Sequence, residues 1–182
     1  SPSQPRSRST HLKPLPMHTS RSGGCTLTGA LSVTTHVRDA VSIIHGPKGC
    51  AHHNFSLFHA TCLDNEQAVL PDLVSSALGE SEIVFGGEDA LARTITSVSC
   101  RDVSAVLVLS TCIAATIGDD VEAVCSRDWP VPVIAIPTAG FLGGTFQHGV
   151  NNALIALSGL ADPEPVRSCV NIIGEKNLEY EV

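Results

Sequence analysis

From about residue 25 onward the chain alternates short apolar runs with segments of helical pattern. Three runs are continuous and rich in β-branched or small apolar residues, which is typical of strands buried on both faces of a sheet. These runs lie within residues 37–44, 102–110 and 131–136. Because helical segments follow them, we expect an α/β fold with a parallel sheet, right-handed crossovers and helices on both faces, as in a Rossmann-like domain.

The segments between the runs give the remaining elements. We expect one helix that starts near Cys50 and three further helices over residues 89–97, 118–125 and 145–160. Residues 27–35 are expected to be helical or irregular, Pro71 to open a helix, residues 83–85 to form a short strand that stops at Gly86 and Gly87, and residues 170–173 to start one more strand.

Length and composition divide the chain into three parts. At 182 residues it suits one α/β domain, which we place at residues 23–165. Residues 1–22 are rich in Ser, Pro and Arg without apolar periodicity, so we expect a disordered basic arm. Residues 166–182 are expected to begin a following strand or domain that is truncated here.

Charge and hydropathy exclude some function classes. The net charge is −7, and the first 24 residues hold four basic residues and no acid, so the rest of the chain is more acidic still. Nucleic-acid binding needs clustered Lys and Arg, so we expect no nucleic-acid partner. No apolar run approaches the length of a membrane span, and no secretory signal is visible, so we expect a cytoplasmic protein with no membrane partner.

The cysteines carry the candidate chemistry. An odd number of seven, with no export signal, argues against a disulfide framework, and the absence of a Cys-x-x-Cys pair leaves no support for a zinc knuckle. Four of them lie in helix-like or strand-like apolar settings, where a buried packing role is expected: Cys62, Cys100, Cys125 and Cys169.

The other three, Cys25, Cys50 and Cys112, lie at turns or strand ends, where function gathers in parallel sheets. Thiolates hold iron–sulfur clusters, and adjacent glycines allow the backbone to approach a cluster closely. On the residues alone, buried structural thiols and dispersed cluster ligands both remain open. Three thiols are one short of the usual four, so a second chain or a non-cysteine ligand would complete a cluster site.

A set of motifs resembles the nitrogenase component 1 family. They are Gly24-Cys25, residues 45–50 (His-Gly-Pro-Lys-Gly-Cys), residues 84–88 (Val-Phe-Gly-Gly-Glu), residues 110–112 with 117–124, and residues 170–175. The separations of 25 residues from Cys25 to Cys50 and 62 from Cys50 to Cys112 are similar to those of the family's interface cysteines. The first motifs resemble the α-type subunit, and the resemblance covers only its N-terminal domain.

The resemblance implies a cluster-bearing oxidoreductase subunit. Cys25, Cys50 and Cys112 would ligate an iron–sulfur cluster, 4Fe-4S or a larger P-cluster-like one, shared with a like or homologous component 1 subunit. Glycines would lie beside it: Gly24, Gly49, Gly86 and Gly87. An ATP-dependent iron–sulfur reductase would deliver electrons over that site, with the acidic segment 118–120 either near the docking surface or simply an ordinary helix start.

Two other functions stay open. The chain could be a scaffold on which a metal–sulfur cofactor is assembled, or a non-catalytic α/β binding domain. Family subunits contain three such domains, so this chain is expected to be a fragment that is not active alone, and its substrate is not defined. For the histidines, we expect structural hydrogen bonding at His45, as at Lys48, and an exposed helix start at His148. His52 and His53 would be either a surface pair or neighbours of the cluster.

Overall fold

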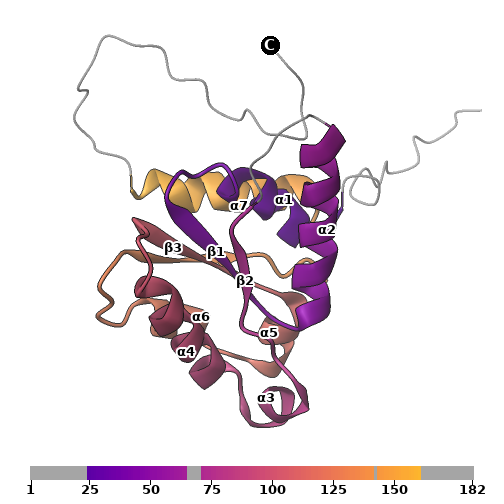
Figure 1. The fold of residues 1–182 in the computed structure, drawn as a ribbon. Coiled ribbons are helices and arrows are strands. Elements are labelled where there is room, and N and C mark those ends of the chain that lie inside the picture. Colours follow the sequence, from indigo (N-terminus) through magenta and orange to yellow (C-terminus); the bar gives the residue numbers. More distant parts are fainter. Residues whose placement is uncertain (1–23, 65–70, 142, 161–182) are drawn as a thin grey trace, which may run out of the picture.

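A parallel sheet of four strands organises the molecule in a computed structural model that describes residues 24–64, 71–141 and 143–160 (Figure 1). The strands are β1 (Ala40–His45), β2 (Leu73–Ser75), β3 (Ala105–Ser110) and β4 (Val133–Pro137), in the order β2-β1-β3-β4. All pairs are parallel, and β1 and β3 are in register along their whole lengths, from Ala40 with Ala105 to His45 with Ser110. The expected α/β class is confirmed.

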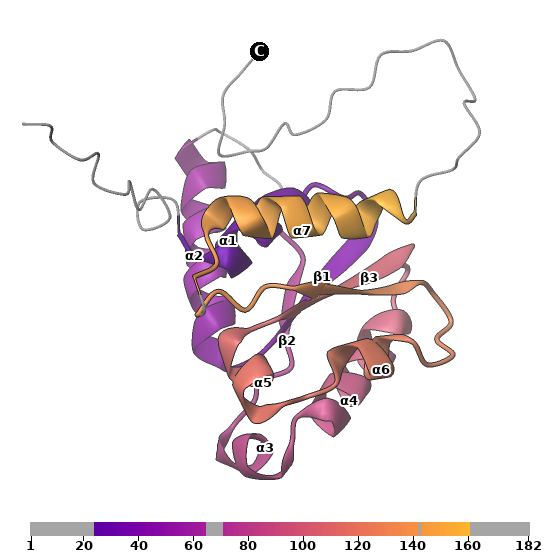
Figure 2. The ribbon, with the colours of Figure 1, turned by 180° about the vertical axis from the view of Figure 1, so that it is seen from behind.

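Helices cover both faces of the sheet. One face carries α1 (Thr26–Thr34) and α7 (Phe146–Ser158), with α2 (Lys48–Asp64) beside them, and the other carries α4 (Glu88–Ser99) and α6 (Val121–Cys125) (Figures 1 and 2). Two short helices follow the carboxyl ends of strands: α3 (Glu80–Phe85) after β2 and α5 (Cys112–Ile117) after β3. No described helix is long and apolar enough to cross a membrane.

The core follows from the alternation of side chains along the strands. In β3, Val106 and Val108 pack with the residues of α4 and α6, whereas Leu107 and Leu109 pack with those of α1 and α7. Residues 105–109 are all buried, as a fully covered parallel strand requires.

Helices α1 and α7 cross in close contact because each has a glycine that lies against the backbone of the other helix. A Cβ added at Gly29 would lie 1.9 Å from the carbonyl oxygen of Phe146, and one at Gly149 would lie 1.9 Å from the carbonyl oxygen of Thr26. Any side chain there would drive the helices apart. The crossing therefore fixes the first turn of α1, next to Cys25.

Two expected elements are wrong. Residues 83–85 belong to helix α3 and not to a strand; its first turn holds Glu80 and Glu82, and the Glu82 carboxylate accepts a hydrogen bond from the Gly79 N–H at 2.9 Å. Pro71 opens no helix but leads into the edge strand β2, because pairing with β1 outweighs local preference.

The remaining elements agree with the sequence to within a few residues, except that the sequence analysis predicts neither helix α5 nor the length of α2, which continues to Asp64. Residues 27–35, left between helix and irregular segment, form α1. Three expectations fall outside the described residues: the arm at 1–22, the segment at 166–182 and its strand at 170–173.

Candidate metal centre

The three cysteines come to the carboxyl edge of the sheet, where the strand order reverses direction. From β1 the chain moves outward to β2, whereas β3 and β4 lie on the opposite side of β1. Such a switch point leaves a crevice between the loops that leave the two central strands. Cys50 lies in the first turn of α2, after β1, and Cys112 is the first residue of α5, after β3.

The loops after β1 and β3 are joined at their base. The carbonyl oxygen of His45 accepts hydrogen bonds from the backbone N–H and the hydroxyl of Thr111, at 3.1 and 2.9 Å. Gly46 makes this approach possible, since a Cβ there would lie 2.3 Å from Oγ1 of Thr111. The residue after Thr111 is Cys112, so this contact holds the Cys112 loop against the turn that leads to Cys50.

Cys25 reaches the same region from the start of α1, where it is the N-cap residue. Its sulfur lies 3.6 Å from Oγ1 of Thr28, and that hydroxyl donates to Oδ1 of Asn54 at 2.7 Å. Nδ2 of Asn54 in turn donates to the carbonyl oxygen of Cys50 at 2.8 Å. A buried chain of two side chains therefore connects Cys25 with Cys50. Gly24, at φ +98°, provides the left-handed turn before Cys25.

The other two cysteines influence the pKa of Cys50. Burial is the main cause that raises the pKa of Cys50, and the negative charges of the Cys25 and Cys112 thiolates raise the pKa further. Three anionic sulfurs in one place repel one another, and bound iron relieves that repulsion. Cys25 is exposed, and Cys50 and Cys112 are half-buried, so the site opens to the surface.

Cys25, Cys50 and Cys112 are not arranged to hold a single metal ion. Within residues 24–64, 71–141 and 143–160, no three His, Cys, Asp or Glu side chains are arranged to hold one metal ion. In an iron–sulfur cluster each cysteine binds a different iron, so the thiolates surround the group and do not converge on one point. Beside Cys50 there is room, since a Cβ added at Gly49 would meet no atom within 4 Å.

Gly86 and Gly87 lie elsewhere, at the junction of α3 and α4. The nearest neighbours of a Cβ at Gly87 are side-chain atoms of Asp119, Leu78 and His45, and a Cβ at Gly86 would meet only Asp119. Both glycines therefore face the Asp119 carboxylate, and their predicted contact with a cofactor stays a prediction.

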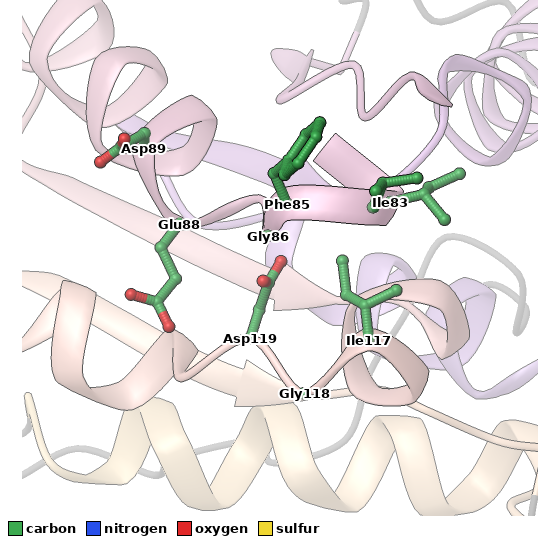
Figure 3. Close-up of a pocket in the computed structure, with 9 residues that line it drawn as sticks. Ile83, Phe85, Gly86, Glu88, Asp89, Ile117, Gly118 and Asp119 are labelled. Carbon is green, nitrogen blue, oxygen red and sulfur yellow. The ribbon is translucent and has the colours of Figure 1, made fainter. Parts of the chain in front are cut away.

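A pocket of about 430 Å³ opens at this junction (Figure 3). It combines apolar side chains of α3 and α5 with carboxylates. It is lined by Ile83, Val84, Phe85, Gly86, Glu88, Asp89, Ile117, Gly118 and Asp119.

The polar residues that the sequence singled out have mostly structural roles. His45 is fully buried and hydrogen-bonded on both ring nitrogens, as expected, whereas Lys48 is exposed. Asp120 caps α6 by accepting the Ala123 N–H at 2.9 Å, so an ordinary helix start is confirmed there. His148 is exposed and caps the start of α7.

The other histidines and cysteines named in the sequence analysis, where their side chains are described, are either exposed or buried in the core. His52 and His53 are both exposed on α2. Cys125 is buried in the core, as expected, but Cys100 is exposed, because it lies just after the last turn of α4. The side chain of Cys62 and all of Cys169 lie outside the described part of the chain.

The structure thus defines an α/β protein with a parallel sheet and three cysteines in the loops at its carboxyl edge. A family model described as nitrogenase component 1 type oxidoreductase matches residues 25–181, and the chain belongs to that family. The resemblance found in the sequence is therefore confirmed.

Individual relatives agree with this assignment. The chain is 32% identical over 168 residues to the nitrogenase iron-molybdenum cofactor biosynthesis protein NifE of Nostoc sp., covering 88% of this chain and 35% of that protein. It is 33% identical over 179 residues to the nitrogenase molybdenum-iron protein alpha chain of Methanothermobacter thermautotrophicus, covering 87% and 38%.

A solved structure titled "Nitrogenase Cp1 at pH 5" superposes with a TM-score of 0.64 at 26% identity, over 79% of this chain and 30% of that one. The chain thus spans about a third of the length of the proteins it matches.

Proposed function

We propose that this chain is the cluster-bearing part of a nitrogenase component 1-like oxidoreductase subunit, in which Cys25, Cys50 and Cys112 ligate an iron–sulfur cluster. The observation that carries the proposal is the convergence of the three cysteine loops, which the Thr28–Asn54 chain and the contact between His45 and Thr111 hold together at the carboxyl edge. The group would be a 4Fe-4S or larger P-cluster-like cluster, and it would accept and release single electrons.

A second chain would complete the site. Three cysteines leave one iron of a 4Fe-4S cluster without a protein ligand. Cys25 is exposed to solvent. A like or homologous component 1 subunit, placed over Cys25, would supply the missing ligand and cover the open side. The cluster would then lie at a subunit interface.

Besides the cysteines, four residues of this chain would have a part in this site. The Thr28–Asn54 pair orients Cys25 relative to Cys50, and the contact between His45 and Thr111 sets the position of Cys112. Covered by the second subunit, these groups would exclude water from the thiolates. Burial and hydrogen bonds to sulfur would then set the reduction potential.

The electron donor would be an ATP-dependent iron–sulfur reductase, and helix α3 offers a surface for it. Val84 is 72% exposed and Phe85 86% exposed, although both are large and apolar, and Ile83 beside them is 43% exposed. Clustered exposed apolar side chains beside polar ones indicate a protein–protein interface. Because α3 follows β2 at the same edge of the sheet as the cysteine loops, a reductase bound there would lie on the cluster side.

A scaffold for cofactor assembly is the second candidate. What favours it is the set of similar proteins, since several of them carry the name of a cofactor biosynthesis protein, at 30–32% identity. In a scaffold the same thiols would hold a metal–sulfur group during maturation.

The first test is an anaerobic iron and sulfide assay, with visible and EPR spectra, on the full chain. We expect stoichiometric iron and sulfide with a broad charge-transfer band in the wild type, and loss of both in Cys50→Ala. The matched control is Cys125→Ala, which removes a buried thiol outside the site and is expected to retain the cluster. A colourless, iron-free wild type from cells competent in cluster assembly would leave a plain α/β binding domain.

A second test separates electron relay from assembly. The cluster-loaded subunit pair is mixed with an ATP-dependent iron–sulfur reductase, and the cluster signal is followed by EPR with and without ATP. Relay predicts ATP-dependent reduction of the cluster with the iron retained. Release of the metal–sulfur group to an acceptor protein, without ATP-dependent reduction, would instead establish the scaffold.

A further inference from the structure

His45 connects three loops at the carboxyl edge through its contacts with Ser76, Asp119 and Thr111. Its imidazole is fully buried between Ser76, which follows β2, and Asp119, which follows α5. Nδ1 lies 2.9 Å from Oγ of Ser76, and Nε2 lies 2.9 Å from Oδ2 of Asp119. The other carboxylate oxygen of Asp119 accepts the N–H of Gly87 at 2.8 Å, and the carboxylate points from its loop toward the α3–α4 junction (Figure 3).

The donors and acceptors of this chain fix the form of the imidazole. Oγ of Ser76 accepts the N–H of Gly46 at 3.1 Å, so its own hydrogen is free to be donated to Nδ1 of His45. Nε2 then carries the ring hydrogen and donates it to Asp119. Burial lowers the pKa of His45 and outweighs the opposing effect of Asp119, which agrees with a neutral ring.

The order Ser76, His45, Asp119 is that of a hydrolase triad, but the surroundings do not fit hydrolysis. The Ser76 oxygen is buried and already accepts a hydrogen bond from Gly46. The pocket described above is lined by Asp119 and not by Ser76. The network therefore holds the loops together and presents no nucleophile to a substrate.

The main chain of His45 makes a further contact with a cysteine loop. Its carbonyl oxygen holds Thr111, the residue before Cys112, and its side chain holds the serine that binds the Gly46 N–H, at the start of the turn to Cys50. One residue thus sets where both cysteine loops begin. Through Asp119 and Gly87 it also connects them to the base of α3.

We propose that His45 is the positioning residue of the cysteine site: it fixes the separation of Cys50 and Cys112 and ties both loops to the α3–α4 junction. The proposal rests on the proposed function in one respect, because it takes these two cysteines as cluster ligands. His45 itself would touch neither the thiols nor the cluster.

The first experiment measures how firmly the cluster is held in the cluster-loaded full chain. For His45→Ala we expect iron release to a chelator to be faster by roughly tenfold or more, together with a changed EPR line shape. His45→Gln retains an amide that can donate to Asp119 and is expected to restore part of the slow release. The control is Ser42→Ala, which removes a buried hydrogen bond from the same strand, to Thr34 at 3.0 Å, without touching a cysteine loop.

The second experiment does not need the cluster. In the metal-free full chain, a short bifunctional thiol reagent should link Cys50 to Cys112, with the linked peptides identified by mass spectrometry. We expect the yield of this pair to fall in His45→Ala and to stay at the wild-type level in Ser42→Ala, at a temperature at which both variants are folded.

The outcomes distinguish the two proposals. A wild type without iron, whose Cys50–Cys112 link still depends on His45, would overturn the cluster but support the positioning role. Wild-type iron release or wild-type linking in folded His45→Ala would overturn the positioning role, as would equal losses in Ser42→Ala.

Discussion

Burial is the main cause of a raised pKa in half-buried Cys50 and in buried Cys125, yet the two thiols belong to different regions of the molecule. Cys125 ends α6 in the apolar core under α4, where burial and the charge of Glu122 raise its pKa to about 12. Cys50 lies at the polar carboxyl edge, where the charges of Cys25 and Cys112 add to the effect of burial.

The difference shows that burial alone does not identify a ligand thiol. A buried cysteine among valines is a small apolar side chain, neutral and inert. The thiolate form of Cys50 is disfavoured by burial and by the charges of Cys25 and Cys112. Hydrogen-bonded loops hold the three cysteines at the carboxyl edge, whereas apolar packing excludes water from the α6 core.

The largest effect on the cysteine edge is expected when a side chain is added where helices α1 and α7 cross. For Gly149→Ala we expect a loss of about 1–3 kcal/mol or more in the free energy of unfolding, because the new methyl group would overlap the Thr26 carbonyl. The shift of α1 should also move Cys25 away from Cys50 and lower cluster retention. Urea unfolding and iron content measure the two effects.

The control for this variant is Gly159→Ala, at the other end of α7, where a Cβ would have its nearest neighbour at 3.4 Å. It should be nearly neutral in both measurements. Equal stability of Gly149→Ala and the wild type would contradict the packing described for the crossing.

The second expected effect is a pH dependence of stability that comes from His45, at the polar edge. Burial lowers the pKa of His45, against the opposing hydrogen bond and charge of Asp119 and the charge of Glu88. Above the ordinary histidine pKa of about 6.5 both folded and unfolded chains are neutral at this ring, so stability is full. Below it the unfolded chain binds a proton that the folded chain does not, and stability falls by up to about 1.4 kcal/mol per pH unit.

Urea unfolding of the wild type and His45→Gln as a function of pH checks this expectation. The variant should lose less stability than the wild type as the pH falls below about 6.5. Equal pH dependence in the two proteins would show that His45 does not titrate differently on folding.

The two thiols should also differ in the metal-free chain when each is replaced by alanine. Cys125→Ala is expected to cost about 1 kcal/mol of unfolding free energy, since it leaves a gap in the core. Cys50→Ala should cost less, because Cys50 is only half-buried and packs at the margin of the core cluster that includes Leu27 and Leu31. A larger loss for Cys50→Ala would assign Cys50 a packing role instead.

The smallest effect on stability is expected at α3. Phe85→Ser should change the unfolding free energy by no more than about 0.5 kcal/mol, because the ring is 86% exposed. If a reductase binds there, ATP-dependent reduction of the cluster should slow markedly in the same variant. Unchanged reduction kinetics would place the docking surface elsewhere.

Much of the fold could be predicted from the sequence, because the periodic segments are also the packed ones. The apolar run of β3 is continuous since both of its faces are covered, and α7 carries the cap of Thr145 and His148 at its start. The three cysteines stood out because each lies next to a turn or strand end, which in a parallel sheet means a shared edge.

The misassigned elements are those whose sequence pattern has another cause. Residues 83–85 look like a strand because they are apolar and partly β-branched, but in α3 these side chains are exposed, so their pattern does not report a core. β2 is three residues long and depends on its pairing with β1. The contacts of His45 with Ser76 and Asp119 span 31 and 74 positions of the chain, and no local motif specifies them.

The central claim, that Cys25, Cys50 and Cys112 act as one set of ligands, is tested most directly by cysteine alkylation. The full chain is treated with iodoacetamide before and after anaerobic cluster loading, and each cysteine is quantified by mass spectrometry. We predict that these three become protected together on loading, while exposed Cys100 reacts in both states and buried Cys125 in neither. Undiminished alkylation of Cys50 after loading would contradict the claim.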